Sequence, residues 1–340
     1  MTKKIRLVDL AKQAGVSTAT VSRVLNDKGS VAVETRHAVL AALDLLGYER
    51  PERLRERGGG LIGLILPELT NPIFPSFAQH LQTMMSMQNY TPLFGTQVAG
   101  ATTEDAYVEA MLRHRVSGLI FVSGLHADLT ADLERYERIA ARGIPFVTIN
   151  GANPQLDAPD FSADDYSAVT QAMRYLIAQG HSRIGLATGP LRFVPAKVKA
   201  DAYRDALQKF LPNIPPMHAV TLFTVEGGQS AAQDLIKRGC TAIICGSDVM
   251  ALGAIRFCHH AGIRVPQDVS IIGYDDSPLI AFSDPPLTTL RQPVKAISEA
   301  AINALITNIQ GTNMINNSMR FASELIVRSS AGPVNKNNRS

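Results

Sequence analysis

Cysteine is scarce in this chain of 340 residues, which contains only Cys240, Cys245 and Cys258. Because the number is odd and no C-x-x-C pair is present, the sequence predicts neither a disulfide framework nor a zinc site. Three ordinary buried thiols in a reducing compartment are the simpler expectation. The chain also lacks an apolar signal region at its start and any apolar run long enough to cross a bilayer. We therefore expect a cytoplasmic protein that does not contact the membrane.

Motifs of the common enzyme classes are missing as well. The sequence has no G-x-S-x-G, no P-loop and no paired metal-ligand spacing. Glycines at 58–60 and 63 precede and enter an apolar run, whereas a dinucleotide-binding fingerprint follows one. His259 and His260 fall near the end of a predicted helix, where surface or capping roles are expected. The sequence therefore favours a protein that is not an enzyme and that needs no cofactor or metal.

Charge is unevenly distributed along the chain. Residues 1–57 hold eleven Lys and Arg against seven Asp and Glu, although the whole chain holds 33 against 30, so the remainder is slightly acidic. The length suits two or three domains, and contents of 46% hydrophobic and 19% charged residues are typical of a globular protein. A positive excess confined to the amino-terminal segment is typical of a module that contacts phosphates.

Two short helical patterns separated by a glycine open the sequence. Apolar residues recur at helical spacing over 7–14, and Gly15 interrupts them because glycine tolerates a left-handed backbone. Ser17 is a good N-cap for a second helix over 18–26, whose apolar stripe begins at Val21. Two short helices joined by a tight turn predict a helix-turn-helix, whose second helix enters the DNA major groove. The alternative is a surface helical hairpin with a polar face.

The exposed side chains of the second helix are small or able to form hydrogen bonds, which allows the helix to approach base edges. Arg23 can bond guanine through two N–H groups, and Asn26 can reach a base or a phosphate. Threonine methyl groups can contact thymine methyl groups. These residue types favour DNA binding over a plain surface hairpin.

A third helix is predicted over 34–46, and it completes a head domain over 1–48. Tyr48 follows this helix and can place its hydroxyl on a phosphate. Residues 49–60 alternate Arg with Glu and end in three glycines. This composition predicts a linker, either a solvated tether or a short basic segment that orders against DNA.

From residue 61 onward, short apolar runs of buried-strand type alternate with helical patterns. The alternation predicts an α/β core with parallel sheets covered on both faces, and its length favours two lobes within 61–330. We expect the first lobe to end near Asn150, the segment 320–327 to cross between lobes, and residues 331–340 to form a flexible tail. The predicted strands are 61–66, 91–95, 117–122, 145–149, 183–188, 219–223, 241–246 and 269–273, and the predicted helices are 74–88, 104–114, 130–142, 165–179, 197–210, 229–238, 248–261 and 293–309.

Ligands of parallel sheets bind outside the carboxyl ends of the strands. Polar and aromatic residues gather at these positions, an inventory that suits a sugar, a nucleoside or another small polar ligand between the lobes. For any single Asp or Ser, a capping or turn role is an equal alternative. The strand-end residues are 71–74, Ser123, Asn150, 189–192, Phe223, Ser247, Asp248, Asp275 and Asp276.

With these features, the chain resembles the LacI/GalR family of bacterial transcription regulators. The resemblance lies in VDLAKQAGVSTATVSRVLN at the start, in ETRHAVLAALDLLGY, and in SDVMALGAI, GIRVPQDVSIIGYDD and DPPLTTLRQP near the end. It implies an N-terminal helix-turn-helix head, a periplasmic-binding-protein-like core of two lobes, and a homodimer on a near-palindromic double-stranded operator. It also implies that a small effector in the cleft, a sugar, a sugar derivative or a nucleoside, changes DNA affinity.

The resemblance also implies roles for individual residues. In the second helix, Ala19 stands where many family members carry a larger side chain, so the family's operator preference does not transfer. For DNA it implies base contacts by Thr18, Ala19, Arg23 and Asn26, and phosphate contacts by Ser17, Thr20 and Ser22. For the effector it implies Ile73, Phe74, Ser123, Asn150, Phe223, Ser247, Asp248 and Asp275, with Asp275 as the strongest candidate.

The sequence departs from the family pattern in two places. Lys199 stands where the family usually has an effector-binding arginine, and a point charge replaces a planar fork there. Arg192 or Lys197 is a candidate to share that role. The hinge is shortened to PERLRERGGG, in which Leu54 is the only aliphatic candidate for a wedge in the minor groove. The glycines disfavour a hinge helix.

The sequence hypothesis is therefore a dimeric repressor controlled by an effector. Whether the effector releases DNA as an inducer or promotes binding as a corepressor stays open. Two other classes remain as alternatives, a small-molecule carrier of the periplasmic-binding type and an enzyme on an α/β fold. The positively charged head argues against the first, and the missing catalytic motifs argue against the second.

Overall fold

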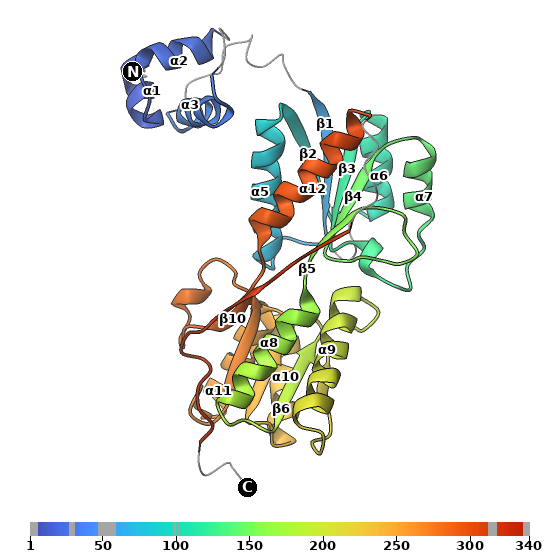
Figure 1. Cartoon of the computed structure of the whole chain (residues 1–340), viewed down its shortest axis with the longest axis vertical. Coiled ribbons are helices and arrows are strands. Elements are labelled where there is room, and N and C mark those ends of the chain that lie inside the picture. Colours follow the sequence, from blue (N-terminus) through green and yellow to red (C-terminus); the bar gives the residue numbers. More distant parts are fainter. Residues whose placement is uncertain are drawn as a thin grey trace.

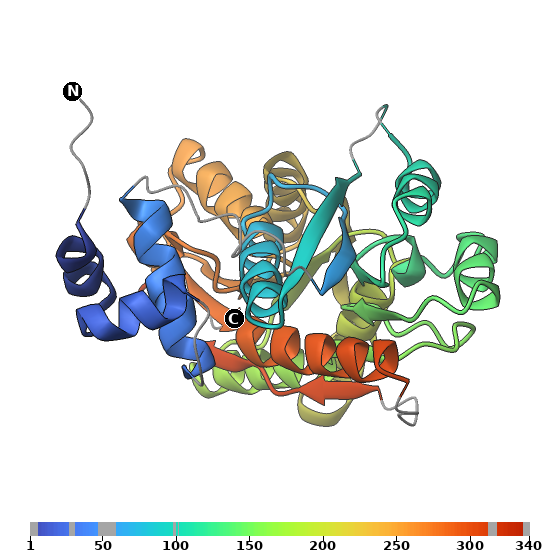
Figure 2. The ribbon, with the colours of Figure 1, turned by 90° about the horizontal axis from the view of Figure 1, so that it is seen from above.

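The computed structural model describes residues 6–26, 31–46, 59–97, 100, 102–311 and 318–335. A small helical head lies to one side of a larger core, which consists of two stacked α/β lobes (Figures 1 and 2). Within the described ranges, no helix combines the length and the apolar character needed to span a membrane.

The head consists of three helices, α1 (Leu7–Ala14), α2 (Thr18–Leu25) and α3 (Val33–Leu45). Gly15 ends α1 with a left-handed backbone at φ 64°, as the sequence predicted. The Ser17 Oγ accepts a hydrogen bond from the Thr20 N–H at 3.1 Å and so caps α2. The helices are held together by a small apolar core of Leu10, Ala11, Val21, Val24, Val39, Ala42 and Leu43.

The first lobe contains a six-stranded sheet in the order β11-β5-β4-β3-β1-β2, in which all neighbours are parallel. One face packs against α5 and α12, and the other packs against α6 and α7. The strands are β1 (Gly60–Leu66), β2 (Tyr90–Thr96), β3 (Gly118–Val122), β4 (Phe146–Ile149), β5 (Asp160–Ala163) and β11 (Met319–Phe321). The helices are α5 (Ile73–Met87), α6 (Glu104–Arg113), the short 3₁₀ turn η1 (Leu125–Ala127), α7 (Glu134–Ala141) and α12 (Val294–Ile309).

The second lobe repeats this plan with a sheet in the order β12-β10-β9-β8-β6-β7. Its neighbours are parallel except β10 and β12, which are antiparallel. Helices α8 and α9 cover one face, and α10 and α11 cover the other. The strands are β6 (Ile184–Thr188), β7 (Met217–Val220), β8 (Ala242–Cys245), β9 (Ser270–Asp275), β10 (Thr288–Arg291) and β12 (Glu324–Ile326). The helices are α8 (Asp165–Ala178), α9 (Val194–Phe210), α10 (Val225–Lys237), α11 (Asp248–His260) and the 3₁₀ turn η2 (Ile280–Phe282).

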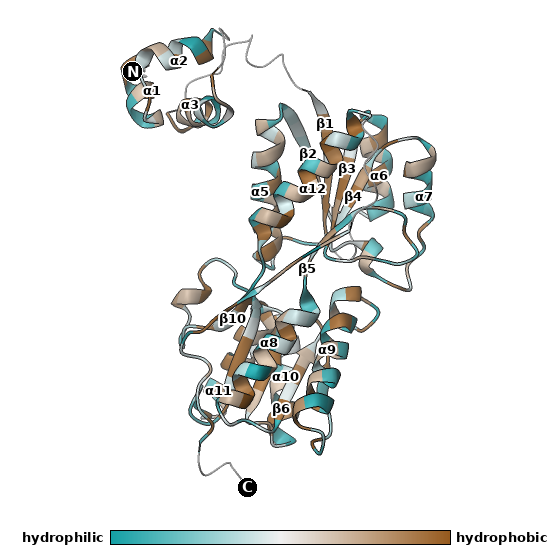
Figure 3. Cartoon of the chain, viewed as in Figure 1, coloured by the Kyte–Doolittle hydropathy of each residue, from teal (hydrophilic) through white to brown (hydrophobic). Residues whose placement is uncertain are grey.

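The burial of these strands explains why the sequence showed continuous apolar runs. Every residue of β3, β4, β5, β6, β8 and β9 is buried, because helices cover both faces of a parallel sheet. Hydrophobic colour accordingly concentrates on the strands between the helices (Figure 3). The predicted α/β class is confirmed, and the three cysteines are free and buried as expected. His259 and His260 lie exposed at the end of α11, also as expected.

The chain passes between the lobes at β5–α8, at β10–α12 and at β11–β12 (Figure 1). The predicted crossing within 320–327 is confirmed, because β11 and β12 belong to different sheets. The predicted end of the first lobe near Asn150 is wrong, because β5, β11 and α12 also belong to that lobe. Their return to the first lobe depends on tertiary pairing, which the order of elements along the chain does not reveal.

Three further expectations need correction. The strand predicted over 219–223 is β7, which ends at Val220, three residues before the predicted end. Helix α7 begins at Glu134, four residues after the predicted start. Residues 331–335 are not a free tail, since Ala331 and Val334 are buried and the Gly332 N–H donates to Ser270 Oγ at 3.1 Å. The Val334 N–H donates to the carbonyl of Gln179 at 3.0 Å. Backbone hydrogen bonds therefore hold residues 331–335 against the second lobe, although the polar side chains of this segment suggested disorder.

Candidate functional site

The outer face of α2 carries the residues that the sequence assigned to DNA. Thr18, Ala19 and Arg23 are exposed, whereas Val21 and Val24 are buried against the other two helices. This division leaves one face of α2 available to a groove of duplex DNA. Of the remaining head candidates, Ser17 is exposed and Thr20 and Ser22 are half-buried.

Four of these polar side chains, those of Ser17, Thr20, Ser22 and Asn26, already have partners within the head. Ser17 caps α2 through Thr20, and Asn26 Nδ2 donates to the Ser22 carbonyl at 2.8 Å and to Ser22 Oγ at 3.2 Å. Asn26 therefore closes the end of α2 with its amide nitrogen, which leaves its oxygen as the group available to a partner. Tyr48 and Leu54, which were also assigned to DNA, lie outside the described residues.

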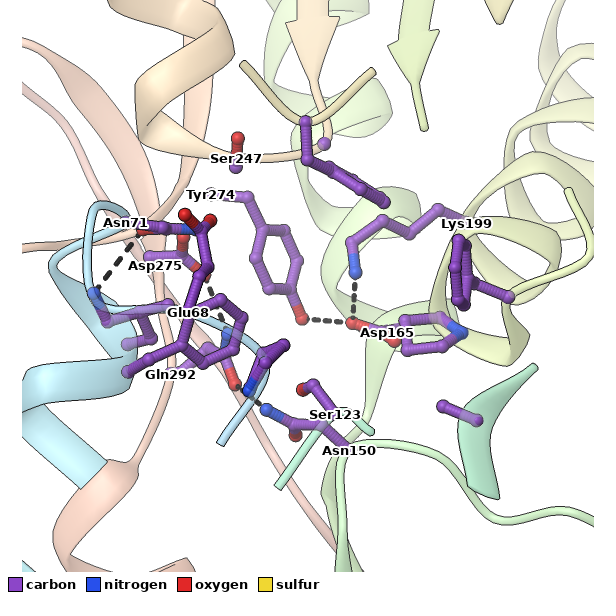
Figure 4. A pocket seen from close by; sticks show the side chains of 18 residues that line it. Glu68, Asn71, Ser123, Asn150, Asp165, Lys199, Ser247, Tyr274, Asp275 and Gln292 are labelled. Atoms are coloured by element: carbon purple, nitrogen blue, oxygen red, sulfur yellow. Dashed lines mark hydrogen bonds and ion pairs between the residues drawn. The ribbon is translucent and has the colours of Figure 1, made fainter. Parts of the chain in front are cut away.

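A second candidate site is a cavity of about 210 Å³ between the two lobes. Eighteen residues line it, drawn from both lobes and from the crossover segments (Figure 4). The structure brings together eight of the ten residues that the sequence assigned to the effector. These eight are Ile73, Phe74, Ser123, Asn150, Lys199, Phe223, Ser247 and Asp275.

Aromatic rings and prolines form the apolar walls of this cavity. Phe74 comes from the first lobe, whereas Phe193 and Phe223 come from the second, with Pro195 beside them. Phe223 lies against the backbone of Gly189 at the end of β6, where a Cβ atom would overlap its ring. Glycine at that position therefore allows the ring to reach the cavity. Flat apolar walls of this kind match the faces of a small ring-shaped ligand.

A chain of amide and carboxylate groups joins the two lobes across the cavity. Asn150 Nδ2 donates to Gln292 Oε1 at 3.2 Å, and Gln292 Nε2 donates to Asp275 Oδ1 at 2.6 Å (Figure 4). Asn150 follows β4 in the first lobe, Asp275 ends β9 in the second, and Gln292 lies on the crossover between them. A shift of one lobe against the other therefore changes this chain of hydrogen bonds.

Asp275 is the most unusual of the cavity residues. It is only 5% exposed, and its Oδ2 has no hydrogen-bond partner among the described residues. Burial, and next the nearby Asp248 carboxylate, raise the pKa of Asp275 well above its usual value, although Gln292 and Lys199 oppose the shift. A buried oxygen without a partner costs free energy unless a ligand or water satisfies it. Asp275 is thus suited to accept a hydrogen bond from a bound hydroxyl.

Backbone strain concentrates around the same cavity. Ser123, Asn150 and Asp275 have left-handed φ values of 45°, 59° and 123°, a region that residues with a side chain rarely occupy. All three stand at the carboxyl ends of strands and line the cavity. Strain of this kind persists where the surrounding fold imposes it, and it clusters at functional sites.

Lys199 forms a closed group with two residues that the sequence did not single out. Its Nζ donates to Asp165 Oδ1 at 2.7 Å and lies 3.9 Å from the centre of the Tyr274 ring. The Tyr274 hydroxyl donates to the same Asp165 oxygen. Lys199 comes from α9, Asp165 from the first turn of α8, and Tyr274 from β9 (Figure 4).

The other two predicted effector residues do not line the cavity. Arg192 Nε lies 2.9 Å from Asp128 Oδ2, and the Leu129 N–H donates to the Arg192 carbonyl at 2.8 Å. Because Asp128 follows η1 in the first lobe and Arg192 precedes α9 in the second, these contacts connect the lobes beside the cavity. We call them the interlobe clasp.

Asp248 acts behind the cavity wall. Its Oδ2 accepts from the Ser277 N–H at 2.7 Å, and its Oδ1 accepts from Thr289 Oγ1 at 2.6 Å. It is fully buried, and this burial raises its pKa to about 6. These bonds tie Asp248 to β10 and to the loop that follows Asp275 at the end of β9, so Asp248 positions the cavity residue and does not itself line the cavity.

Sequence reasoning missed five polar or aromatic residues of the cavity wall, namely Glu68, Asp165, Phe193, Tyr274 and Gln292. Asn71, which also lines it, was noted only as part of a strand end. Tyr274 carried a weak signal, because it precedes Asp275 directly. Asp165 and Gln292 carried none, since each lies on a crossover whose path the sequence does not reveal.

Comparison with known proteins decides the family. A family model described as "Bacterial regulatory proteins, lacI family" matches residues 6–51, and one described as "Periplasmic binding protein-like domain" matches 173–331. The HTH-type transcriptional regulator reg1 of Streptomyces lividans is 52% identical over 337 residues, 96% of each chain. The chain belongs to the LacI family. MalR of Streptomyces coelicolor is 52% identical over 334 residues, and the repressor CytR of Escherichia coli is 32% identical over 328, covering 96% and 95% of this chain and the same share of each relative.

Solved structures of this family match nearly the whole chain. One described as a transcriptional regulator CelR–cellobiose complex has a TM-score of 0.70 at 26% identity, covering 96% of this chain and all of that one. The lac repressor dimer bound to operator and an anti-inducer has a TM-score of 0.70 at 26% identity, covering 97% and 100%. This LacI-family protein is therefore a DNA-binding transcriptional regulator with a periplasmic-binding-protein-like core, and it is not an enzyme.

Proposed function

We propose that this regulator is a repressor that binds a near-palindromic operator as a homodimer and is controlled by a sugar or sugar derivative in the interlobe cavity. One observation carries the proposal. The cavity combines aromatic walls with a buried Asp275 oxygen that has no partner among the described residues. Such a site needs a ligand that offers both hydroxyl donors and an apolar ring face.

The DNA-binding part of the proposal rests on α2. Thr18, Ala19 and Arg23 are its exposed residues, and Arg23 is the residue best suited to read guanine. In a homodimer, the two heads engage half-sites in successive major grooves. The operator-bound dimer of the lac repressor supports this arrangement. Ser17, Thr20, Ser22, Asn26, Tyr48 and Leu54 complete the proposed contact surface.

The effector part of the proposal rests on the mixture of groups around the cavity. Ser123, Asn150, Ser247 and Gln292 offer hydroxyl or amide groups that can donate or accept, and Asp275 accepts. Phe74, Phe193 and Phe223 cover the apolar faces of a ring. The cellobiose complex of a relative with the same fold supports a carbohydrate ligand.

Coupling between the two sites follows from the position of the cavity. A ligand that contacts both lobes binds one arrangement of the lobes better than another, and it shifts the equilibrium only by that difference. The Asn150–Gln292–Asp275 chain and the interlobe clasp are the contacts that such a shift would change. The lobes in turn set the spacing of the two heads in a dimer.

Fluorescence anisotropy with the promoter region of the protein's own gene tests the DNA part. We expect sequence-selective binding that changes when sugars from a thermal-shift screen are added. Arg23→Ala should weaken specific binding by about 1–3 kcal/mol with little effect on nonspecific DNA. Arg113→Ala, on α6 of the core, is the matched loss of one positive charge and should leave operator affinity unchanged. Equal weakening by both variants, or no selective binding by the wild type, would contradict the proposal.

A further inference from the structure

Lys199 is the only basic residue that lines the cavity within the described part of the chain, yet its charge is already matched. The side chains of Lys199 and Asp165 are 6% and 13% exposed, and their ion pair measures 2.7 Å. The Tyr274 ring lies against the ammonium group, and the Tyr274 hydroxyl binds the same carboxylate. Lys199 is thus enclosed by an anion and an aromatic face, which together compensate its loss of water.

Two further acidic groups line the cavity wall. Glu68 and Asp275 are carboxyl groups, and burial raises the pKa of each above its ordinary value. The environment therefore already resists negative charge at these two positions. An anionic ligand would place a negative charge in surroundings that already disfavour one, and the one basic residue of the described cavity wall is engaged by Asp165. A hydroxyl group, in contrast, can donate to each carboxyl oxygen without this cost.

We propose that Asp165 is a specificity-determining residue, which holds Lys199 away from ligands and so restricts the cavity to uncharged polyhydroxy compounds, excluding sugar phosphates and sugar acids. This inference rests on the proposed function of the cavity as the effector site. It also gives lysine at position 199 a physical meaning. An enclosed ammonium on a flexible stem can be fully neutralised by one carboxylate, whereas a guanidinium fork keeps further N–H groups free for a ligand.

The test removes the carboxylate charge and asks whether the cavity gains affinity for anions. Glucose 6-phosphate, inorganic phosphate and glucose are titrated into the full-length protein by calorimetry, and thermal shifts are recorded in parallel. The wild type should show no saturable binding of either phosphate. In Asp165→Asn the freed ammonium should give saturable binding of glucose 6-phosphate, at least about tenfold tighter than the detection limit that bounds the wild type, as one new charge-assisted hydrogen bond predicts.

Three matched variants separate specificity from general effects. Asp164→Asn makes the same change in charge one residue earlier, and asparagine is an equally good cap for α8, so it should gain no phosphate affinity. Tyr274→Phe keeps the ion pair and should also gain none. The double variant Asp165→Asn with Lys199→Gln should lose the gain, which assigns it to the ammonium group.

Each outcome decides the inference separately from the proposed function. The inference would be overturned if the wild type bound phosphate saturably and Lys199→Gln abolished that binding. This comparison needs no variant at Asp165. No gain in a folded Asp165→Asn variant would overturn it as well. If the wild type ignores every neutral sugar while Asp165→Asn still gains phosphate affinity, the role of Asp165 stands and the proposed sugar effector fails.

Discussion

The two lobes share one fold but contribute different chemistry to the cavity between them. The first lobe supplies Asn71, Ser123 and Asn150, which are neutral, with Glu68 as its one charged residue. The second lobe supplies Asp165, Lys199 and Asp275, all of which are ionisable. The same sheet architecture thus presents a largely neutral surface on one side and a charged one on the other. We infer that the second lobe provides the stronger ligand contacts and the first lobe adjusts the fit.

The largest expected effect is on sugar affinity, and it comes from Asp275 in the second lobe. Asp275→Asn keeps the side-chain shape, and asparagine tolerates the left-handed backbone at this position. Asparagine presents an NH2 group in place of one carboxyl oxygen, and leaving a buried hydrogen-bonding group unsatisfied costs about 1–3 kcal/mol, so we expect affinity for the sugar found by the screen to fall by about 5- to 150-fold. Calorimetric titration measures this loss. Thermal stability should not fall, since burial already disfavours the charged form of Asp275.

An intermediate effect is expected for Asp248, which lies behind the cavity wall and affects how the free energy of unfolding depends on pH. Burial raises the pKa of Asp248 to about 6 from an ordinary 3.8, so between these pH values the folded protein holds a proton that the unfolded chain releases. The free energy of unfolding therefore falls as pH rises through this window, by up to about 3 kcal/mol. Denaturant titrations from pH 4 to 7 should show this slope in the wild type and a flatter one in Asp248→Asn.

An exposed carboxylate of the second lobe provides the control for that titration. Arg264 lowers the pKa of Asp268 to about 2, so the stability that Asp268 contributes is present above an ordinary carboxyl pKa and is lost as pH falls toward 2. Asp268→Asn should therefore leave the slope between pH 4 and 6 unchanged. If Asp248→Asn also leaves it unchanged, the buried carboxylate is not the source of the wild-type slope.

A smaller effect on sugar affinity is expected from Asn150 in the first lobe, whose cavity residues are largely neutral. Asn150→Gly removes the amide that donates to Gln292 without straining the left-handed backbone at φ 59°. A neutral hydrogen bond contributes about 1 kcal/mol, so sugar affinity should fall by about fivefold. Measured in the same titration, a loss larger than that of Asp275→Asn would reverse the ranking of the two lobes.

The sequence allowed much of this architecture to be predicted, and its failures share one cause. The helices of the head and the strand ends at Ser123, Asn150 and Asp275 followed from periodicity, caps and the rule that parallel sheets bind ligands at their carboxyl ends. The strands β5 and β10 were missed because their sequences, DFSA and TTLR, contain no apolar run. They are strands because neighbouring strands pair with them.

The missed site residues follow the same logic. Gln292 comes after β10 and Asp165 comes after β5, so both lie where the chain passes between lobes. Their place in the cavity depends on how the two lobes meet, which no local pattern encodes. Lys199 was predicted as a cavity residue, but its partner Asp165 lies on another helix. Local patterns thus predicted the walls of the cavity, whereas the contacts that decide its charge required the tertiary structure.

The smallest expected effect concerns the contact that joins the two lobes beside the cavity. The Arg192 side chain is 53% exposed, so its ion pair with Asp128 in the interlobe clasp contributes about 0.2–1 kcal/mol. Arg192→Ala should change sugar affinity by no more than about fivefold, and the change should shrink at high salt. Lys197→Ala is the matched control, because Lys197 is equally exposed and pairs with Asp201 within α9. If Arg192→Ala changes sugar affinity more than the control does, and the difference shrinks at high salt, the interlobe clasp affects the equilibrium between lobe arrangements. If both variants change sugar affinity equally, Arg192 contributes only surface charge.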